Sequence, residues 1–238
     1  PEYLNMRIDK FITTKTDYTR SDIKRLAKAR AIKVDGQFIT DAGFKIDPAV
    51  HTICVFDKAI ETIKARFFML NKPQGIICAT TDSHQQTVID LLDEPNKAAL
   101  QIVGRLDKDT TGLVLITDDG QWNHRVTSPN RQSFKHYIVT LSDTLDESLA
   151  EQFTKGLLLN NETKRTRPAN LNIIDSHHAE LFIQEGKYHQ IKRMFAACGN
   201  HVVALHRQAV GDIHLDINLA VGAYRPLTTD ESDLFNDW

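Results

Sequence analysis

Residues 104–120, with the sequence GRLDKDTTGLVLITDDG, are the stretch that decides the fold of this chain. Residues 104–110 form a charged, polar loop, and residues 113–117 form an apolar, β-branched run that is typical of a buried strand. The stretch therefore predicts several carboxylates on a loop that is held against a rigid strand. Catalytic side chains often lie on loops that such an element positions.

Asp107 is the carboxylate of this loop that we take as the candidate catalytic group. It follows Arg105 by two residues and precedes a Thr-Thr-Gly turn. Asp109, Asp118 and Asp119 lie in the same stretch, and the residue pattern does not choose among the four. The alternative is that Asp107 is a loop residue whose oxygens accept hydrogen bonds from nearby amides.

Short strand-like runs follow one another from residue 67 onward. We expect helices over about residues 87–92, 146–155 and 189–198 to interrupt these strands. Runs of strands with segregated helices favour an α+β domain over a strictly alternating fold. The predicted strands are residues 67–70, 76–78, 113–117, 137–141, 171–174, 179–183, 201–205 and 213–219.

The beginning of the chain predicts a separate, small unit of helices and a hairpin. Apolar residues at helical spacing from Ile8 indicate one helix, and Ser21 is expected to be the N-cap of a second. Asp35-Gly36 between two apolar runs is a strong hairpin signal. The polar segment 58–66 is expected to be a linker. The predicted domains are therefore residues 1–57 and 67–238.

Basic residues are concentrated in the first unit, although the formal net charge of the chain is −2. Residues 1–56 hold ten Lys/Arg and seven Asp/Glu, and between residues 20 and 33 six basic residues face one acid, Asp22. A local basic patch of this kind binds phosphate groups even in a slightly acidic protein. The alternative is a helix face that is merely solvated. The candidate phosphate contacts here, called the basic face below, are Arg20, Lys24, Arg25, Lys28 and Lys33.

Several classes of protein are not expected from this sequence. No run of about 18 apolar residues predicts a membrane helix, and residues 1–10 lack the apolar core of a signal peptide, so we expect a cytoplasmic protein. Cys54, Cys78 and Cys198 match neither a disulfide framework nor a zinc motif. We expect no metal, no cofactor and, because no heptad pattern occurs, a monomer.

The stretch around Asp107 closely resembles the signature of the pseudouridine synthases, whose aspartate occupies this position. Three further segments resemble the branch of that family that acts on small-subunit ribosomal RNA: MLNKPQG at residues 69–75, TDDGQWNHR and TSP within residues 117–129, and EGKYHQIKRMF at residues 185–195. The first unit resembles an S4 RNA-binding domain. The resemblance therefore covers nearly the whole chain.

This resemblance implies a catalytic domain built on a mainly antiparallel, mixed sheet with flanking helices. It also implies isomerisation of uridine 516 of 16S ribosomal RNA to pseudouridine, without a cofactor, in an assembly intermediate of the small subunit. A synthase of the same family that acts on 23S ribosomal RNA is one alternative. A non-catalytic RNA-binding protein of ribosome assembly is another.

The resemblance assigns roles to individual residues as well. Asp107 matches the catalytic aspartate, Lys192 the basic residue that pairs with it, and Tyr137 the aromatic residue that contacts the extruded uracil. A solvated lysine on a helix and a core tyrosine on a strand are the respective alternatives. A lysine is a point charge without the fork of an arginine, so it fixes the geometry of the pair less strictly.

Three arginines are further candidates for contact with RNA. Arg105 matches a residue that, in relatives, fills the gap that the flipped base leaves in the stack. Arg193 and Arg207 are candidate phosphate contacts, with ordinary surface charge as the alternative.

Overall fold

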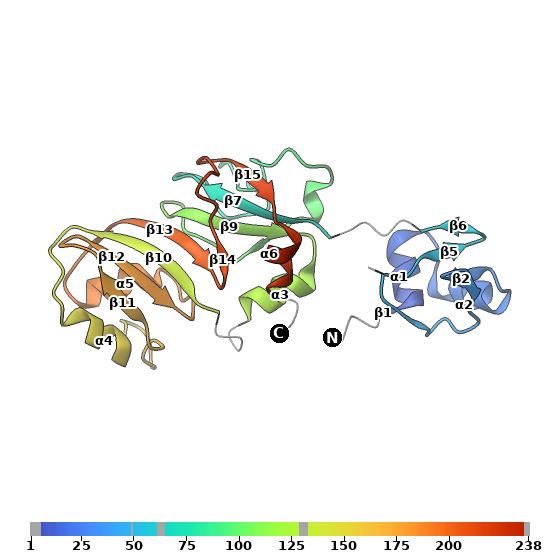
Figure 1. Ribbon diagram of the computed structural model, residues 1–238, viewed down its shortest axis with the longest axis horizontal. Coiled ribbons are helices and arrows are strands. Elements are labelled where there is room, and N and C mark those ends of the chain that lie inside the picture. The colour runs from blue at the N-terminus through green and yellow to red at the C-terminus, as the bar shows by residue number, and fades with distance from the viewer. Residues whose placement is uncertain (1–5, 49, 61–64, 129–132, 236–238) are drawn as a thin grey trace. The chain divides into compact units, whose positions relative to one another are not determined.

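The computed structural model describes residues 6–48, 50–60, 65–128 and 133–235. The chain divides into two compact units, Pro1–Lys64 and Ala65–Trp238, which Figure 1 colours by residue number. Lys58 and Ala59 form strand β6 of the first unit, so the prediction that a linker begins at residue 58 is wrong. Lys58 pairs with Val55 across a hairpin, whereas residues 61–64 of the predicted linker lie outside the described part of the chain.

The first unit packs two helices against short antiparallel strands. Strands β3-β2-β5-β6 form one sheet, and β1 pairs with β4. Its core consists of buried aliphatic residues and one buried phenylalanine, Phe11. The bounds are β1 (Met6–Arg7), α1 (Ile8–Lys15), α2 (Arg20–Lys28), β2 (Ile32–Val34), β3 (Gln37–Phe38), β4 (Lys45–Ile46), β5 (Ile53–Val55) and β6 (Lys58–Ala59).

The predicted hairpin of this unit is confirmed, but the predicted helix cap is wrong. Asp35 and Gly36 both have positive φ, at 49° and 80°, as a two-residue turn between β2 and β3 requires. The N-cap of α2 is Thr19 and not Ser21. Thr19 Oγ1 accepts a hydrogen bond from Asp22 N, and Asp22 Oδ2 accepts one from Thr19 N, which makes a reciprocal capping box.

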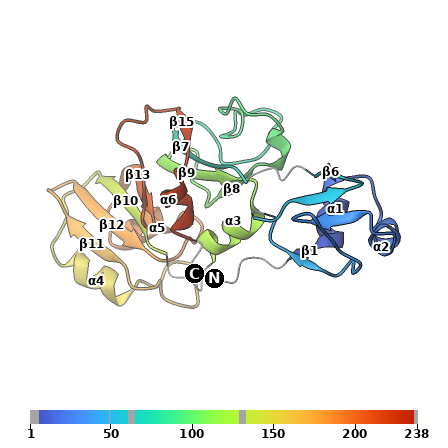
Figure 2. The same cartoon turned by 45° about the vertical axis from the view of Figure 1, so that its right-hand side comes forward.

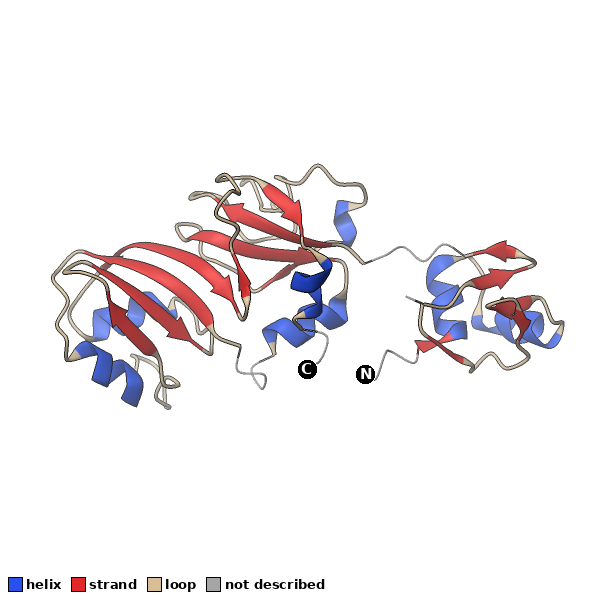
Figure 3. Cartoon of the chain, viewed as in Figure 1, coloured by secondary structure: helices blue, strands red, loops and turns tan. Residues whose placement is uncertain are grey.

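The second unit is built on a single mixed sheet, which confirms the expected α+β fold (Figure 3). Its main path is β11-β12-β10-β13-β9-β7-β15, with β8 paired to β9 and β14 to β13. β13 and β9 are parallel, and the other ladders of this sheet are antiparallel. The strands are β7 (Phe67–Lys72), β8 (Gln101–Val103), β9 (Thr111–Thr117), β10 (Lys135–Leu141), β11 (Asn170–Ile173), β12 (His178–Ile183), β13 (Val202–Val210), β14 (Ile213–His214) and β15 (Tyr224–Pro226).

Short helices flank this sheet (Figure 2). α4 (Leu149–Lys155) packs against β11 and α5 (Gln190–Ala197) against β13, while α3 (Gly120–Thr127) contacts β8 and β9. The short helices η1 (Lys97–Ala99) and α6 (Thr229–Asp233) complete the unit. Phe153 of α4 and Phe195 of α5 meet in the larger hydrophobic core, with ring centroids 4.9 Å apart. No helix of the described residues is long and apolar enough to cross a membrane.

Residues 76–92 depart from the predicted elements. The expected strand at 76–78 contributes only an isolated bridge between Ile77 and Thr87. The expected helix at 87–92 is absent. The chain forms turns there instead, closed by hydrogen bonds from Asp90 N to Thr87 O and from Leu92 N to Ile89 O. The apolar residues of this segment are nevertheless buried in the core, although the segment is not helical.

Gly112 allows β9 to approach β13 closely at the point where the polar loop ends. Its φ is +103°, and a Cβ placed there would lie 2.3 Å from Arg207 O. Only glycine fits both the positive φ and the short distance. This contact fixes where the loop of residues 104–110 meets the parallel pair of strands.

Candidate active site

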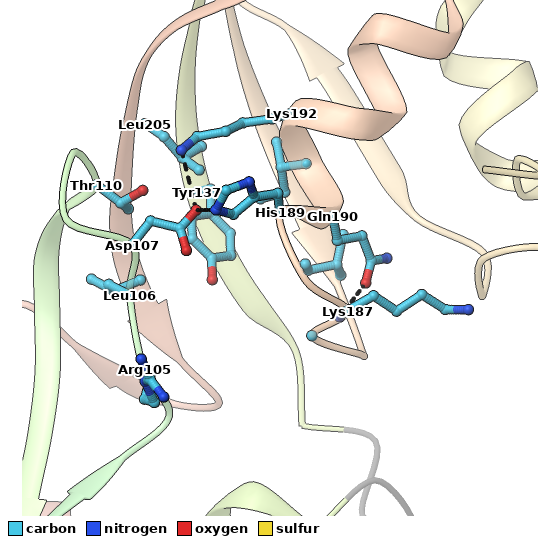
Figure 4. A pocket seen from close by; sticks show the side chains of 13 residues that line it. Arg105, Leu106, Asp107, Thr110, Tyr137, Lys187, His189, Gln190, Lys192 and Leu205 are labelled. Atoms are coloured by element: carbon cyan, nitrogen blue, oxygen red, sulfur yellow. Dashed lines mark hydrogen bonds and ion pairs between the residues drawn. The ribbon is translucent and has the colours of Figure 1, made fainter. Parts of the chain in front are cut away.

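Asp107 lies on the loop between β8 and β9, at one wall of a pocket in the second unit (Figure 4). Leu106 anchors the loop in the core, and Thr110, which is also buried, donates its N–H to Asp107 O at 3.1 Å. The Asp107 carboxylate meets cationic or titratable side chains from α5 and its N-terminal end. Within the described residues it does not cap amides of its own loop, as the alternative supposed.

Lys192 of α5 donates to two carboxylates of this loop. Its Nζ lies 3.1 Å from Asp107 Oδ2, and 2.7 Å and 3.0 Å from the two oxygens of Asp109. Partial burial opposes the charge of Lys192, but the hydrogen bonds to both aspartates outweigh burial and raise the pKa of the ammonium group. The hydrogen bond from Lys192 lowers the pKa of Asp109. An ammonium and two carboxylates therefore face one another across the pocket wall.

Tyr137 lines the same pocket from β10. Tyr137 is 7% exposed and belongs to the core cluster. The residue therefore packs in the core and also contributes to the pocket wall. Figure 4 shows the Tyr137 ring and Leu205 of β13 among the side chains that line the pocket together with Asp107. An apolar floor next to a charged carboxylate is a suitable surface for a planar base.

His189, the residue before α5, brings a third side chain to the carboxylate. Its Nε2 lies 3.5 Å from Asp107 Oδ2, and its backbone is left-handed, with φ of 46°. A non-glycine residue in this region is uncommon and points to local strain. Sequence reasoning missed His189, although it falls within the segment EGKYHQIKRMF.

Lys72 holds the loop that carries Asp107 through hydrogen bonds to backbone carbonyls. It is the last residue of β7, and its side chain is fully buried. Its Nζ donates to the carbonyl oxygens of Pro73, Lys108 and Thr110, at 3.1, 3.1 and 2.7 Å. Burial lowers the pKa of this lysine. The two last carbonyls flank Asp109 within the loop, so the ammonium of Lys72 holds the backbone that presents the carboxylates.

The structure separates the three arginines that the sequence grouped as RNA contacts. Arg105 is exposed and lines the pocket beside Asp107. Arg193 forms an ion pair with Glu162 and donates to the carbonyl of Asn160. Arg207 is 1% exposed and donates to Leu113 O and Gly104 O, so its prediction as a phosphate contact is wrong. It instead ties the loop to β13.

The basic face of the first unit is partly neutralised by its own neighbours. Arg20, Lys24 and Lys28 are exposed along α2. Arg25 forms an ion pair with Asp22 at 3.2 Å. Lys33 pairs with Asp57, and its ammonium lies over the ring of Phe38.

Lys72 and Asp109 are two further residues of the site to which the sequence assigned no role. Lys72 lies in the segment MLNKPQG, and Asp109 is one of the four carboxylates of the stretch 104–120. Both residues therefore lie in segments that the sequence singled out. The described residues contain no group of His, Cys, Asp and Glu side chains that is suited to hold a metal ion.

Two family models match the chain. Residues 66–197 match the model described as RNA pseudouridylate synthase, and residues 6–50 match the S4 domain. The fold, the pocket and these matches define a pseudouridine synthase that carries an S4 RNA-binding domain. The chain belongs to the RNA pseudouridylate synthase family, in the branch of ribosomal small subunit pseudouridine synthase A.

Relatives over nearly the full length support this assignment. The ribosomal small subunit pseudouridine synthases A of Escherichia coli K12 and Yersinia pestis are 48% and 47% identical over 226 residues, which are 95% of this chain and 98% and 96% of theirs. The Haemophilus influenzae protein of the same name is 44% identical over 95% of this chain and 97% of its own. A solved structure described as the crystal structure of pseudouridylate synthase matches with a TM-score of 0.70 and 44% identity, covering 96% of this chain and 98% of that one.

Proposed function

We propose that this enzyme isomerises uridine 516 of 16S ribosomal RNA to pseudouridine, with Asp107 as the catalytic carboxylate. The observation that carries the proposal is one pocket in which Asp107, Tyr137 and Lys192 meet. The names of the relatives supply the small-subunit target. The chain is proposed to act as a monomer in the cytoplasm, on an assembly intermediate of the small subunit.

The reaction replaces the N1–C1′ bond of uridine by a C5–C1′ bond. No atoms enter or leave overall, so the proposal includes neither a cofactor nor a metal. The uridine must first leave its stack, at a cost of a few kcal/mol, before a side chain reaches its sugar or ring. Tyr137 then contacts the face of the extruded uracil, and Arg105 at the pocket rim fills the vacated place in the stack.

The next step uses the Asp107 carboxylate, and Lys192 places a positive charge 3.1 Å from it. Lys192 keeps its ammonium at neutral pH, because the hydrogen bonds to the two aspartates raise its pKa. The ionised Asp107 serves as the nucleophile or stabilises positive charge on the sugar while N1 departs. The detached uracil rotates on the Tyr137 ring and re-attaches through C5, and the C5 proton leaves last.

The substitution Asp107→Asn tests the catalytic assignment. It keeps the size of the side chain but removes its charge, so we expect pseudouridine formation to cease while RNA binding stays within a few-fold. Conversion of tritiated uridine in 16S transcripts measures turnover, and filter binding measures affinity. Retained turnover would remove Asp107 from its role.

Mapping of modified uridines in a strain that lacks the gene tests the target. We expect position 516 of 16S ribosomal RNA to be unmodified there and to regain pseudouridine with the intact gene. Loss at a 23S position instead would assign the enzyme to the other target, and unchanged maps with no turnover in vitro would favour a non-catalytic assembly role.

A further inference from the structure

The loop before α5 carries a stacked pair of aromatic side chains at the edge of the pocket. The ring centroids of Tyr188 and His189 are 3.8 Å apart, with 19° between the ring planes. His189 lines the pocket, whereas Tyr188 is 76% exposed. A tyrosine this exposed buries little apolar surface, so core packing does not account for its position.

The backbone around this pair is held in place before any substrate binds. The buried Gln190 accepts from Lys187 N and donates to Glu185 Oε1, both at 2.9 Å. Arg193 Nη1 donates to Tyr188 O at 3.2 Å. These bonds fix the loop in which His189 keeps its left-handed backbone. Strain that the surroundings maintain in this way is concentrated at functional sites.

We propose that Tyr188 and His189 form a stacking platform for the nucleobase next to the target uridine in the RNA. The inference rests on the proposed pocket at Asp107, which His189 contacts at 3.5 Å. When the target is extruded into that pocket, each neighbouring nucleotide stays tethered to it by one phosphodiester and has lost its stacking partner. The exposed ring of Tyr188 stacks on His189, which lines the same pocket, and replaces that partner, as aromatic residues do for unpaired RNA bases.

Three full-length variants test the platform by affinity. Tyr188→Ala removes the ring, and we expect the Kd and KM for RNA to rise about tenfold, with little change in kcat at saturating RNA. Tyr188→Phe and Tyr188→Trp keep a stacking surface and should remain within about twofold of the wild type. Ile217→Ala, at a side chain that is 94% exposed in the same unit, is the control for loss of exposed apolar surface. Melting temperatures verify that the variants fold.

Fluorescence of 2-aminopurine, placed on either side of the target uridine, tests the stacking itself. The RNA is whichever ribosomal fragment the wild type modifies, so a wrong target would reject the proposed function without deciding the platform. We expect quenching at one position with the wild type and Tyr188→Phe, and its loss with Tyr188→Ala. Quenching at neither position with the wild type, quenching that survives Tyr188→Ala, or an unchanged Kd of Tyr188→Ala would each overturn the proposal.

Discussion

Single side chains in the pocket are tied to residues far away in the sequence. Lys192 joins Asp107 across 85 positions and Asp109 across 83. Because its ammonium is shared, neither carboxylate is fully compensated by it. A charge in a partly enclosed site interacts more strongly than the same charge in water. We therefore expect the electrostatic interaction between Lys192 and Asp107 to matter for the proposed reaction.

Replacing Lys192 separates the role of its charge from that of its packing. We expect Lys192→Met to lower kcat by roughly 10²- to 10³-fold, as the removal of one electrostatic stabiliser does. Because the pKa of Lys192 is raised, the wild-type ammonium is charged throughout the neutral range, and the loss should be the same from about pH 6 to 8. Lys192→Arg should keep most activity, and single-turnover assays compare the variants. Equal rates for Lys192→Met and the wild type would contradict the proposed pairing.

Lys72 gives a prediction about stability at the same scale. Lys72→Met preserves length and volume but leaves the carbonyls of Lys108 and Thr110 without their buried donor. We expect the free energy of unfolding to fall by about 2–4 kcal/mol, since unsatisfied buried groups cost about 1–3 kcal/mol each. Urea denaturation measures this change. A drop below about 0.5 kcal/mol, which is usual for surface sites, would show that the ammonium does not hold the loop.

Among the elements, the parallel contact between β9 and β13 places the pocket. It brings the loop that carries Asp107 beside Leu205, which lines the pocket from β13. β10 lies on the other side of β13 and contributes Tyr137. α5 packs against β13 and delivers Lys192. Residues from four separate elements therefore converge because one strand contacts all the others.

Gly112→Ala tests this contact. The new methyl group would lie 2.3 Å from a backbone oxygen of β13, at a φ that L-residues disfavour, so we expect a loss of about 3 kcal/mol or more. Gly222→Ala in the same unit is the matched control: its φ is also positive, at +84°, but no atom lies within 4 Å of the new carbon. It should cost only about 1 kcal/mol. Similar losses in the two variants, measured by denaturant unfolding, would refute the close approach.

At the scale of the whole molecule, the basic face and the pocket lie in different units. The first unit holds the basic face, and the second holds the pocket, although residues 57–238 carry more acids than bases. Phosphate contacts position a protein on RNA but do not select the base. We therefore expect the S4 unit to supply binding strength and the pocket to supply the reaction.

Replacing Arg20, Lys24 and Lys28 together by glutamine tests this division. The three side chains are exposed on α2, so the fold should persist. Each lost phosphate contact reduces the salt dependence, and we expect the slope of log K against log[salt] to fall by roughly two units. Filter binding from low to moderate salt measures the slope, with Lys155→Gln, another exposed lysine, as the control. An unchanged slope would refute phosphate binding by this face.

The sequence alone determined the features that depend on residues close together along the chain, such as turns and strands. The hairpin at Asp35-Gly36 followed from two residues that tolerate positive φ, and most strands followed from apolar runs. The motif around Asp107 also identified the family and the α+β fold. Helix ends were less predictable, because Thr19 and Ser21 are both good caps and only the bonds to Asp22 decide between them.

Only the tertiary structure decided which charges are free and which are bound. Arginine and lysine usually lie at the surface, but Arg207 and Lys72 are buried. Both donate hydrogen bonds to backbone carbonyls of segments that the fold brings close. The sharing of Lys192 between two aspartates and the approach of His189 to Asp107 likewise depend on how α5 packs against the sheet. Such contacts depend on strand register and packing over scores of residues, which local spacing does not encode.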